Sequence, residues 1–172
     1  TFGYPKLRLN LIVEYADGSK ETIATNTSWK LTTEGAIRSN NEYDGEEYDA
    51  RKELGNWTQS GYDDKSWIAA QRVSIPSGTL RAQIMPGMKV MDTLKPVSIQ
   101  KLGDKYIRDF GQNMAGWMRF RIKGQAGDSI RLRFAETLQA NGELYTRNLR
   151  DARSTDTYIA VSYTHLRAHE TK

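Results

Sequence analysis

The sequence YIRDFGQNMAGWMRFRIK, residues 106–123, decides the fold of this chain. Its first part is rich in strand-favouring residues, and residues 111–113 are the types that form tight turns. Its second part alternates, with Met118, Phe120 and Ile122 on one side and basic residues on the other. A period of two is typical of a half-buried β-strand. The stretch therefore predicts two strands joined by a tight loop.

A second alternating strand follows a glycine-containing turn at residues 124–128. Its apolar side chains and those of the preceding strand are expected to lie on one side of adjacent strands. We predict one buried face made of Met118, Phe120, Ile122, Ile130, Leu132 and Phe134. The alternate positions are arginines, at 119, 121, 131 and 133. We interpret them as a solvated face, because no aromatic residue interleaves with them as single-stranded nucleic acid would require.

The same period of two recurs elsewhere in the chain. Residues 7–15 alternate, residues 16–19 have hairpin chemistry, and residues 21–25 return. A last strand is predicted at residues 155–159. Since no stretch shows the helical period of 3.6, the chain is predicted to be all-β, with no helix longer than about three turns.

Composition excludes several classes of function. The 172 residues carry a net charge of +4 and no cysteine, and the two histidines are His165 and His169. Disulfides and thiolate chemistry are thereby excluded, and catalysis through histidine is disfavoured. No apolar run of about 18 residues spans a membrane, and no signal peptide is visible. The compartment stays open, and a periplasmic or secreted parent protein is compatible with these residues.

An acidic turn around Asp44-Gly45 is the first candidate site. Carboxylates crowded on a loop suit a hard cation such as calcium. The acidic residues here are Glu42, Asp44, Glu46, Glu47 and Asp49. Their spacing differs from that of an EF-hand loop. The alternative is a solvated turn in which Asp49 pairs with Arg51.

Aromatic residues in a turn-rich segment form the second candidate. Rings beside carboxylates and amides are what a sugar site uses, and also what a small β-domain uses for its core. Trp57 fits either role, whereas Trp67 and the isolated Trp29 are interpreted as core residues. Asp63 or Asp64 is expected to cap a single helical turn that directs Trp67 inward.

Prolines at positions 76, 86 and 96 mark a boundary between two β-units. We predict one domain at residues 1–77 and a second at 78–160. Residues 161–172 lack the pattern of either unit. They are predicted to be an unrelated tail, of the kind left by an adapter or a fusion.

Several motifs in order also resemble one protein family. They are YDGEEYDAR (43–51), YDDKSW (62–67), DFGQNMAGW (109–117), GQAGD (124–128), LRFAETL (132–138) and NGELY (141–145). Together they resemble the β-sandwich region of bacterial α-L-rhamnosidases, over roughly residues 7–159. The resemblance implies the second half of a galactose-binding-like jelly roll, followed by a second antiparallel β-sandwich.

The resemblance also implies where chemistry takes place. In this family the catalytic carboxylates lie in a downstream (α/α)6 barrel and invert the anomeric centre, with room for water between acid and base. No residue here is therefore assigned as catalytic, and Glu136 and Glu143 are interpreted as structural or solvated. Some relatives hold L-rhamnose and calcium through an Asp-Asn pair before Gly-Glu and through a later Trp. This chain has Tyr43-Asp44 instead of that pair.

By this correspondence the candidate sugar-binding residues are Asp44, Glu46 and Trp67, with Asp44 also the candidate calcium ligand. The function so implied is that of a non-catalytic accessory region of an enzyme acting on rhamnose-containing glycosides. No cofactor is required, and neither nucleic acid nor a membrane is an expected partner. The alternatives are a stand-alone carbohydrate-binding β-sandwich and a structural interaction domain.

Overall fold

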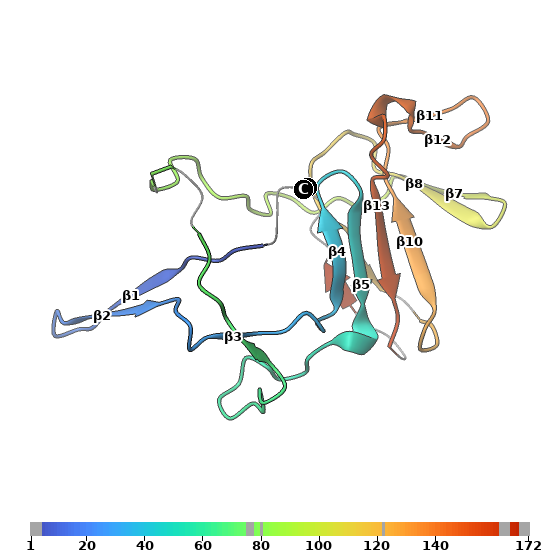
Figure 1. Ribbon diagram of the computed structural model, residues 1–172. Coiled ribbons are helices and arrows are strands. Elements are labelled where there is room, and N and C mark those ends of the chain that lie inside the picture. Colours follow the sequence, from blue (N-terminus) through green and yellow to red (C-terminus); the bar gives the residue numbers. More distant parts are fainter. Residues whose placement is uncertain (1–4, 75–77, 80, 122, 162–165, 169–172) are drawn as a thin grey trace. The chain divides into compact units, whose positions relative to one another are not determined.

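The computed structural model describes residues 5–74, 78–79, 81–121, 123–161 and 166–168 (Figure 1). Within it the chain divides into two compact units. The first comprises Thr1–Glu34 and Gly55–Ile84, and the second comprises Gly35–Leu54 and Met85–Lys172. Each unit therefore contains segments that are separated in the sequence.

An antiparallel hairpin begins the first unit. Strands β1 (Asn10–Glu14) and β2 (Lys20–Ala24) pair along their full length. The turn between them closes because the Asp17 carboxylate accepts hydrogen bonds from the Ser19 N–H and hydroxyl, at 2.9 and 2.6 Å. Gly18 takes the left-handed conformation, with φ of +82°, that this turn needs. The hairpin predicted at residues 16–19 is confirmed.

The rest of the first unit is held by a short strand pair. Strand β3 (Lys30–Leu31) pairs with β6 (Ile68–Ala69), and the Ala70 N–H donates to the Trp29 carbonyl at 2.8 Å. Trp29 is half-buried, and no described residue of this unit is fully buried. Its side chains thus form a thin layer without a closed core.

A four-stranded sheet organises the second unit (Figure 1). Its order is β10-β13-β5-β4, built from β4 (Ile37–Asn41), β5 (Gly45–Asp49), β10 (Ser129–Arg133) and β13 (Thr155–Ile159). The pairs at the two sides are antiparallel, whereas β13 and β5 run parallel, with Tyr158 opposite Tyr48. Parallel neighbours need a long connection. Here residues 50–154, which include β10, connect β5 to β13.

The core lies on one face of this sheet. Among the described residues the buried apolar side chains are Tyr48, Ala50, Tyr158 and Ala160. The rings of Tyr48 and Tyr158 are stacked, with centroids 5.8 Å apart and planes within 3°. Phe120 meets Tyr158 edge to face, at 5.9 Å and 84°. Aromatic pairs favour both arrangements, so these three rings define the centre of the unit.

The predicted face of six apolar residues is only partly as expected. Phe120 and Ile130 do pack against the core, but both are half-buried. Their strands are not neighbours, because β9 (Arg119–Arg121) pairs with β14 (Leu166–Ala168) and β10 pairs with β13. Ile122 lies outside the described residues. Periodicity correctly placed the apolar side chains on one side of each strand, but it does not specify which strands become partners.

Hairpins and single-turn helices complete the second unit. The hairpins are β7 (Ser98–Leu102) with β8 (Lys105–Asp109), and β11 (Thr137–Leu138) with β12 (Leu144–Tyr145). The two 3₁₀ turns are η1 (Ala50–Lys52) and η2 (Arg147–Leu149). The prediction of an all-β chain without a long helix is confirmed for the described residues. None of their helices is long and apolar enough to cross a membrane.

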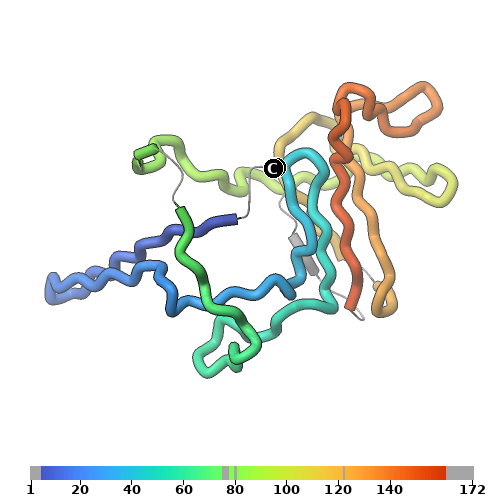
Figure 2. Tube along the Cα trace, viewed as in Figure 1, coloured from blue at the N-terminus to red at the C-terminus, as the bar shows by residue number. Residues whose placement is uncertain are grey.

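The compact units do not follow the order of the chain. Residues 35–54, which lie within the first predicted domain, share the sheet of the second unit. Residues 85–97, whose course the tube in Figure 2 traces, belong to that unit and have no regular secondary structure. Leu166–Ala168, in the predicted tail, form strand β14. The boundary at residues 77–78 and the unrelated origin of the tail stay predictions.

Candidate functional site

The acidic turn lies in the β4–β5 hairpin, where backbone geometry brings it against β13. The Asn41 side-chain oxygen accepts from the N–H groups of Tyr43 and Asp44, at 2.9 and 2.7 Å. Gly45 follows with φ of +99°, and a Cβ at this position would clash with the Thr155 carbonyl. The turn therefore requires glycine for both its conformation and its contact.

Asp44 ties this turn to the segment before β13. One of its carboxylate oxygens accepts from Arg153, at 3.2 Å from Nε and 3.3 Å from the backbone N–H. The other accepts from the Asn41 amide at 3.2 Å. These hydrogen bonds hold the pKa of Asp44 below its ordinary value, and the bond from the Arg153 side chain contributes most to the lowering. Asp44 thus stays ionised and stabilises the contact between two distant segments.

Glu46 is half-buried beside it, at the start of β5. Its carboxylate accepts from the Asn40 amide at 2.7 Å, and its backbone N–H donates to Asp156 Oδ1 at 2.9 Å. Asp156 is itself buried, at 3% exposure, and its other carboxylate oxygen has no hydrogen-bond partner among the described residues. The structure therefore places Asp44 and Glu46 at the same end of the sheet, where β5 begins.

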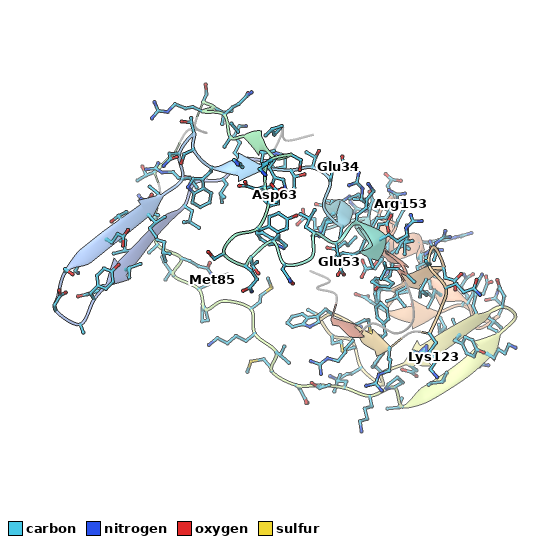
Figure 3. All side chains as sticks on the ribbon, turned by 90° about the horizontal axis from the view of Figure 1, so that it is seen from below. Glu34, Glu53, Asp63, Met85, Lys123 and Arg153 are labelled. Carbon is cyan, nitrogen blue, oxygen red and sulfur yellow. The ribbon has the colours of Figure 1, made fainter. Side chains whose placement is uncertain are left out.

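An open groove of about 590 Å³ covers the other face of this sheet. Alternation directs polar side chains into it, because the apolar ones occupy the core face. The charged residues that line the groove are Asp44, Glu46, Glu47, Arg131, Arg133 and Arg153. Figure 3 shows Arg153 among the side chains crowded on this sheet. The groove joins three guanidinium groups to the carboxylates of Asp44 and Glu47, whereas alternation directs the Glu46 side chain to the face of Tyr48.

The third predicted site residue, Trp67, belongs to the first unit. Its ring contacts Trp57, with centroids 6.3 Å apart, and Tyr62 at 5.9 Å. The predicted single turn is present: the Trp67 N–H donates to the Asp64 carbonyl at 3.0 Å, and the Asp63 carboxylate caps the turn by accepting from the Lys65 N–H at 3.2 Å. It does not continue into a helix. Asp64 instead pairs with Lys30 at 2.6 Å. Trp67 thus lies in a unit different from that of Asp44 and Glu46.

Trp57 and Trp67 differ in exposure. Trp67 is half-buried, whereas Trp57 is 53% exposed. The core interpretation thus fits Trp67 better than Trp57. A partly exposed pair of rings beside carboxylates can cover the C–H face of a sugar while the carboxylates take its hydroxyl groups.

Metal binding has little support from the acidic turn. Over the described part of the chain, no three His, Cys, Asp or Glu side chains are gathered in a metal-binding arrangement. Calcium takes six to eight oxygen ligands, and both Asp44 oxygens already accept hydrogen bonds. Asp49, the last acidic residue of the group, forms a bidentate pair with Arg51, at 2.8 Å for both contacts. The pairing of Asp49 with Arg51 is confirmed, and calcium at Asp44 stays a prediction.

Sequence reasoning missed the arginines and Asp156 as members of this site. The alternation of Arg131 and Arg133 was the available signal, and it indicated only an exposed face. Arg153 and Asp156 carry no local pattern that distinguishes them. Only the pairing of β5 with β13 brings them to the acidic turn.

These sheets define the class of protein: an all-β module of the sandwich type. Two family descriptions match it in sequence. The α-L-rhamnosidase N-terminal domain matches residues 1–92, and the bacterial α-L-rhamnosidase concanavalin-like domain matches residues 99–167. The second match extends seven residues past Ala160, into the predicted tail. The chain belongs to the family of the α-L-rhamnosidase N-terminal region.

Individual relatives agree with this assignment. An α-L-rhamnosidase of Streptomyces avermitilis is 41% identical over 164 residues, which are 90% of this chain and 15% of that protein. One of Formosa agariphila is 40% identical over 91% of this chain and 17% of its own length. The chain thus spans about one sixth of these relatives.

Solved structures show the same arrangement. An α-L-rhamnosidase from Dictyoglumus thermophilum superposes with a TM-score of 0.90 at 35% identity, over 98% of this chain and 19% of that one. The Streptomyces avermitilis enzyme, solved in complex with L-rhamnose, gives 0.83 at 37% identity, over 94% and 16%. The resemblance seen in the motifs is confirmed.

Proposed function

We propose that this chain is a non-catalytic accessory region of an α-L-rhamnosidase, a glycoside hydrolase that releases terminal L-rhamnose from glycosides. One observation carries the proposal: the chain corresponds to about one sixth of its relatives and matches their N-terminal and concanavalin-like domains. A downstream helical barrel then supplies the acid and the base. The β-region supports that barrel and contributes to sugar binding.

Two separate sugar contacts are proposed, one at the acidic turn and one at the tryptophan pair, because the two features belong to different units. Asp44 and Glu46 line a polar groove, and Trp67 with Trp57 offers ring surface. A deoxy sugar such as L-rhamnose presents a methyl and C–H face to a ring and vicinal hydroxyl groups to a carboxylate. Tyr43, in place of an acidic neighbour of Asp44, leaves the site with fewer oxygen ligands for calcium. Binding is therefore expected to be weak, in the millimolar range.

Hydrolysis tests the non-catalytic role. The purified chain is incubated with an aryl α-L-rhamnoside, and release of the aryl group is followed over hours. We expect none above the buffer rate. Hydrolysis that disappears when Glu136 or Glu143 is replaced by Gln would place catalytic groups in this region and refute the proposal.

Titration tests the sugar site. L-rhamnose is added to the isotopically labelled chain with and without calcium, and backbone amide shifts are followed by NMR. Asp44→Ala should weaken the response, and the exposed Asp92→Ala serves as control. Binding that Asp44→Ala leaves unchanged would contradict the proposed site. Tight binding without calcium would exclude a metal in it.

A further inference from the structure

The arginines of the groove face form an ordered set. On β10, Arg131 and Arg133 lie two positions apart and share one face, whereas Ile130 and Leu132 occupy the other. Across the sheet, Arg131 is in register with Thr157, and Thr157 is in register with Glu47. A guanidinium, a hydroxyl and a carboxylate thus follow one another across three strands.

The three arginines differ in their electrostatic state. Arg153 is neutralised by Asp44, at 3.2 Å. Neither Arg131 nor Arg133 forms an ion pair with an acidic side chain of the described residues, and Arg133 has only a 3.5 Å hydrogen bond to the Thr146 hydroxyl. Like charges about 7 Å apart on one strand face repel each other. An anion placed between these two guanidinium groups would relieve the repulsion and could be bound in bidentate fashion.

The opposite side of the groove has the opposite chemistry. Glu47 lines it from β5 on the same face as Arg131, two strands away from β10, which corresponds to about 10 Å. Carboxylates only accept hydrogen bonds, and therefore suit hydroxyl groups as donors. The groove thus offers anion-binding groups along β10, hydroxyl acceptors along β5, and the Thr157 hydroxyl between them. One sugar ring that carries an acidic substituent matches this order.

We propose that the groove over the β10-β13-β5-β4 sheet binds a sugar that bears a carboxylate or sulfate group. Arg131 and Arg133 hold the anionic group, and Glu47 accepts from a ring hydroxyl. This inference rests on the proposed carbohydrate-binding role and adds the charge of the ligand. It also separates the groove from the tryptophan pair, which belongs to the other unit.

NMR titration of the full 172-residue chain tests the proposal. The probes are D-glucuronate, D-glucose 6-sulfate and neutral D-glucose, at equal ionic strength. We expect amide shifts along β10 and β13 with at least one anionic sugar, and a response to D-glucose at least tenfold weaker. Whichever anionic sugar responds identifies the acidic group. Equal responses to all three sugars, or none, would overturn the proposal.

Variants assign the response to the arginines. Arg131→Gln with Arg133→Gln should weaken binding of the anionic sugar at least tenfold, and each single variant should show part of that loss. Arg108→Gln, an exposed arginine on β8 outside the groove, is the matched control and should bind normally. Undiminished binding in the double variant would refute the assignment.

L-rhamnose in the same titration separates the two proposals. Rhamnose binding without binding of any anionic sugar refutes the anionic ligand and leaves the proposed function standing. Arginine-dependent binding of glucuronate without rhamnose binding refutes the rhamnose preference and supports the inference.

Discussion

Removing the Tyr158 ring tests whether the fold depends on the core between β5 and β13. This side chain is 3% exposed, stacks on Tyr48 at 5.8 Å and receives Phe120 edge to face at 5.9 Å. Truncating a buried aromatic residue to alanine costs about 3–5 kcal/mol, through lost burial and the cavity left behind. Each aromatic pair adds about 0.5–1.5 kcal/mol beyond its area. Taking the lower limit of each contribution, we expect Tyr158→Ala to lose at least about 4 kcal/mol of unfolding free energy.

The loss should be decisive because the second unit has little other core. Four apolar residues are buried among those described, and two of them are alanines. A domain is typically stable by about 5–15 kcal/mol, so at the lower limit the variant would retain only about 1 kcal/mol. Strand pairing alone does not compensate, since hydrogen bonds of the unfolded backbone go to water instead.

Urea unfolding gives the measurement. Tryptophan fluorescence and far-ultraviolet circular dichroism are recorded for the wild-type chain and for Tyr158→Ala, and the free energies are obtained by linear extrapolation. Tyr106→Ala is the matched control, because Tyr106 is 59% exposed on β8 and its loss should change stability by about 0.5 kcal/mol or less. A loss below about 1 kcal/mol for Tyr158→Ala, or one equal to the control, would refute the reasoning.

Two further changes probe the acidic hairpin. Gly45→Ala should destabilise the chain more than Gly18→Ala. Both glycines have positive φ, but only at Gly45 does the new Cβ meet the Thr155 carbonyl. Equal losses of unfolding free energy in urea would contradict that contact. The hydrogen bonds from Arg51 hold the pKa of Asp49 below its ordinary value of 3.8. Their stabilisation is therefore present above about pH 4 and is lost as the pH falls through the folded-state pKa. Asp49→Asn should make the unfolding free energy depend less on pH in the acidic range. An unchanged pH dependence would show that other carboxylates determine the acid sensitivity.

The sequence by itself determined the local structure. Alternating residues specified strands at 129–133 and 155–159, because a period of two separates the two faces of a sheet. Asp17-Gly18-Ser19 specified a hairpin, since its side-chain hydrogen bonds and positive φ are local. The all-β class followed from the same period, and the family resemblance followed from ordered motifs.

The candidate site was predictable only in part. Asp44 and Glu46 are close in sequence and stay close in the fold, so a local motif could find them. The capped turn before Trp67 was also predictable, because the Asp63 cap and the closing hydrogen bond are both local. Arg153 and Asp156 reach the acidic turn from a distant segment, and no local spacing encodes that contact.

Tertiary structure alone decided which strands become partners. The parallel pairing of β5 with β13, and the antiparallel pairing of β9 with β14 instead of β10, cannot be read from periodicity. A strand exposes the same backbone donors and acceptors to any neighbour, so its partner is selected by packing across distant segments. Here the stack of Tyr48 on Tyr158 and the close approach of Gly45 to Thr155 make that selection. Those contacts also create the polar groove, because the same alternation that buries the rings directs Arg131 and Glu47 to the opposite face.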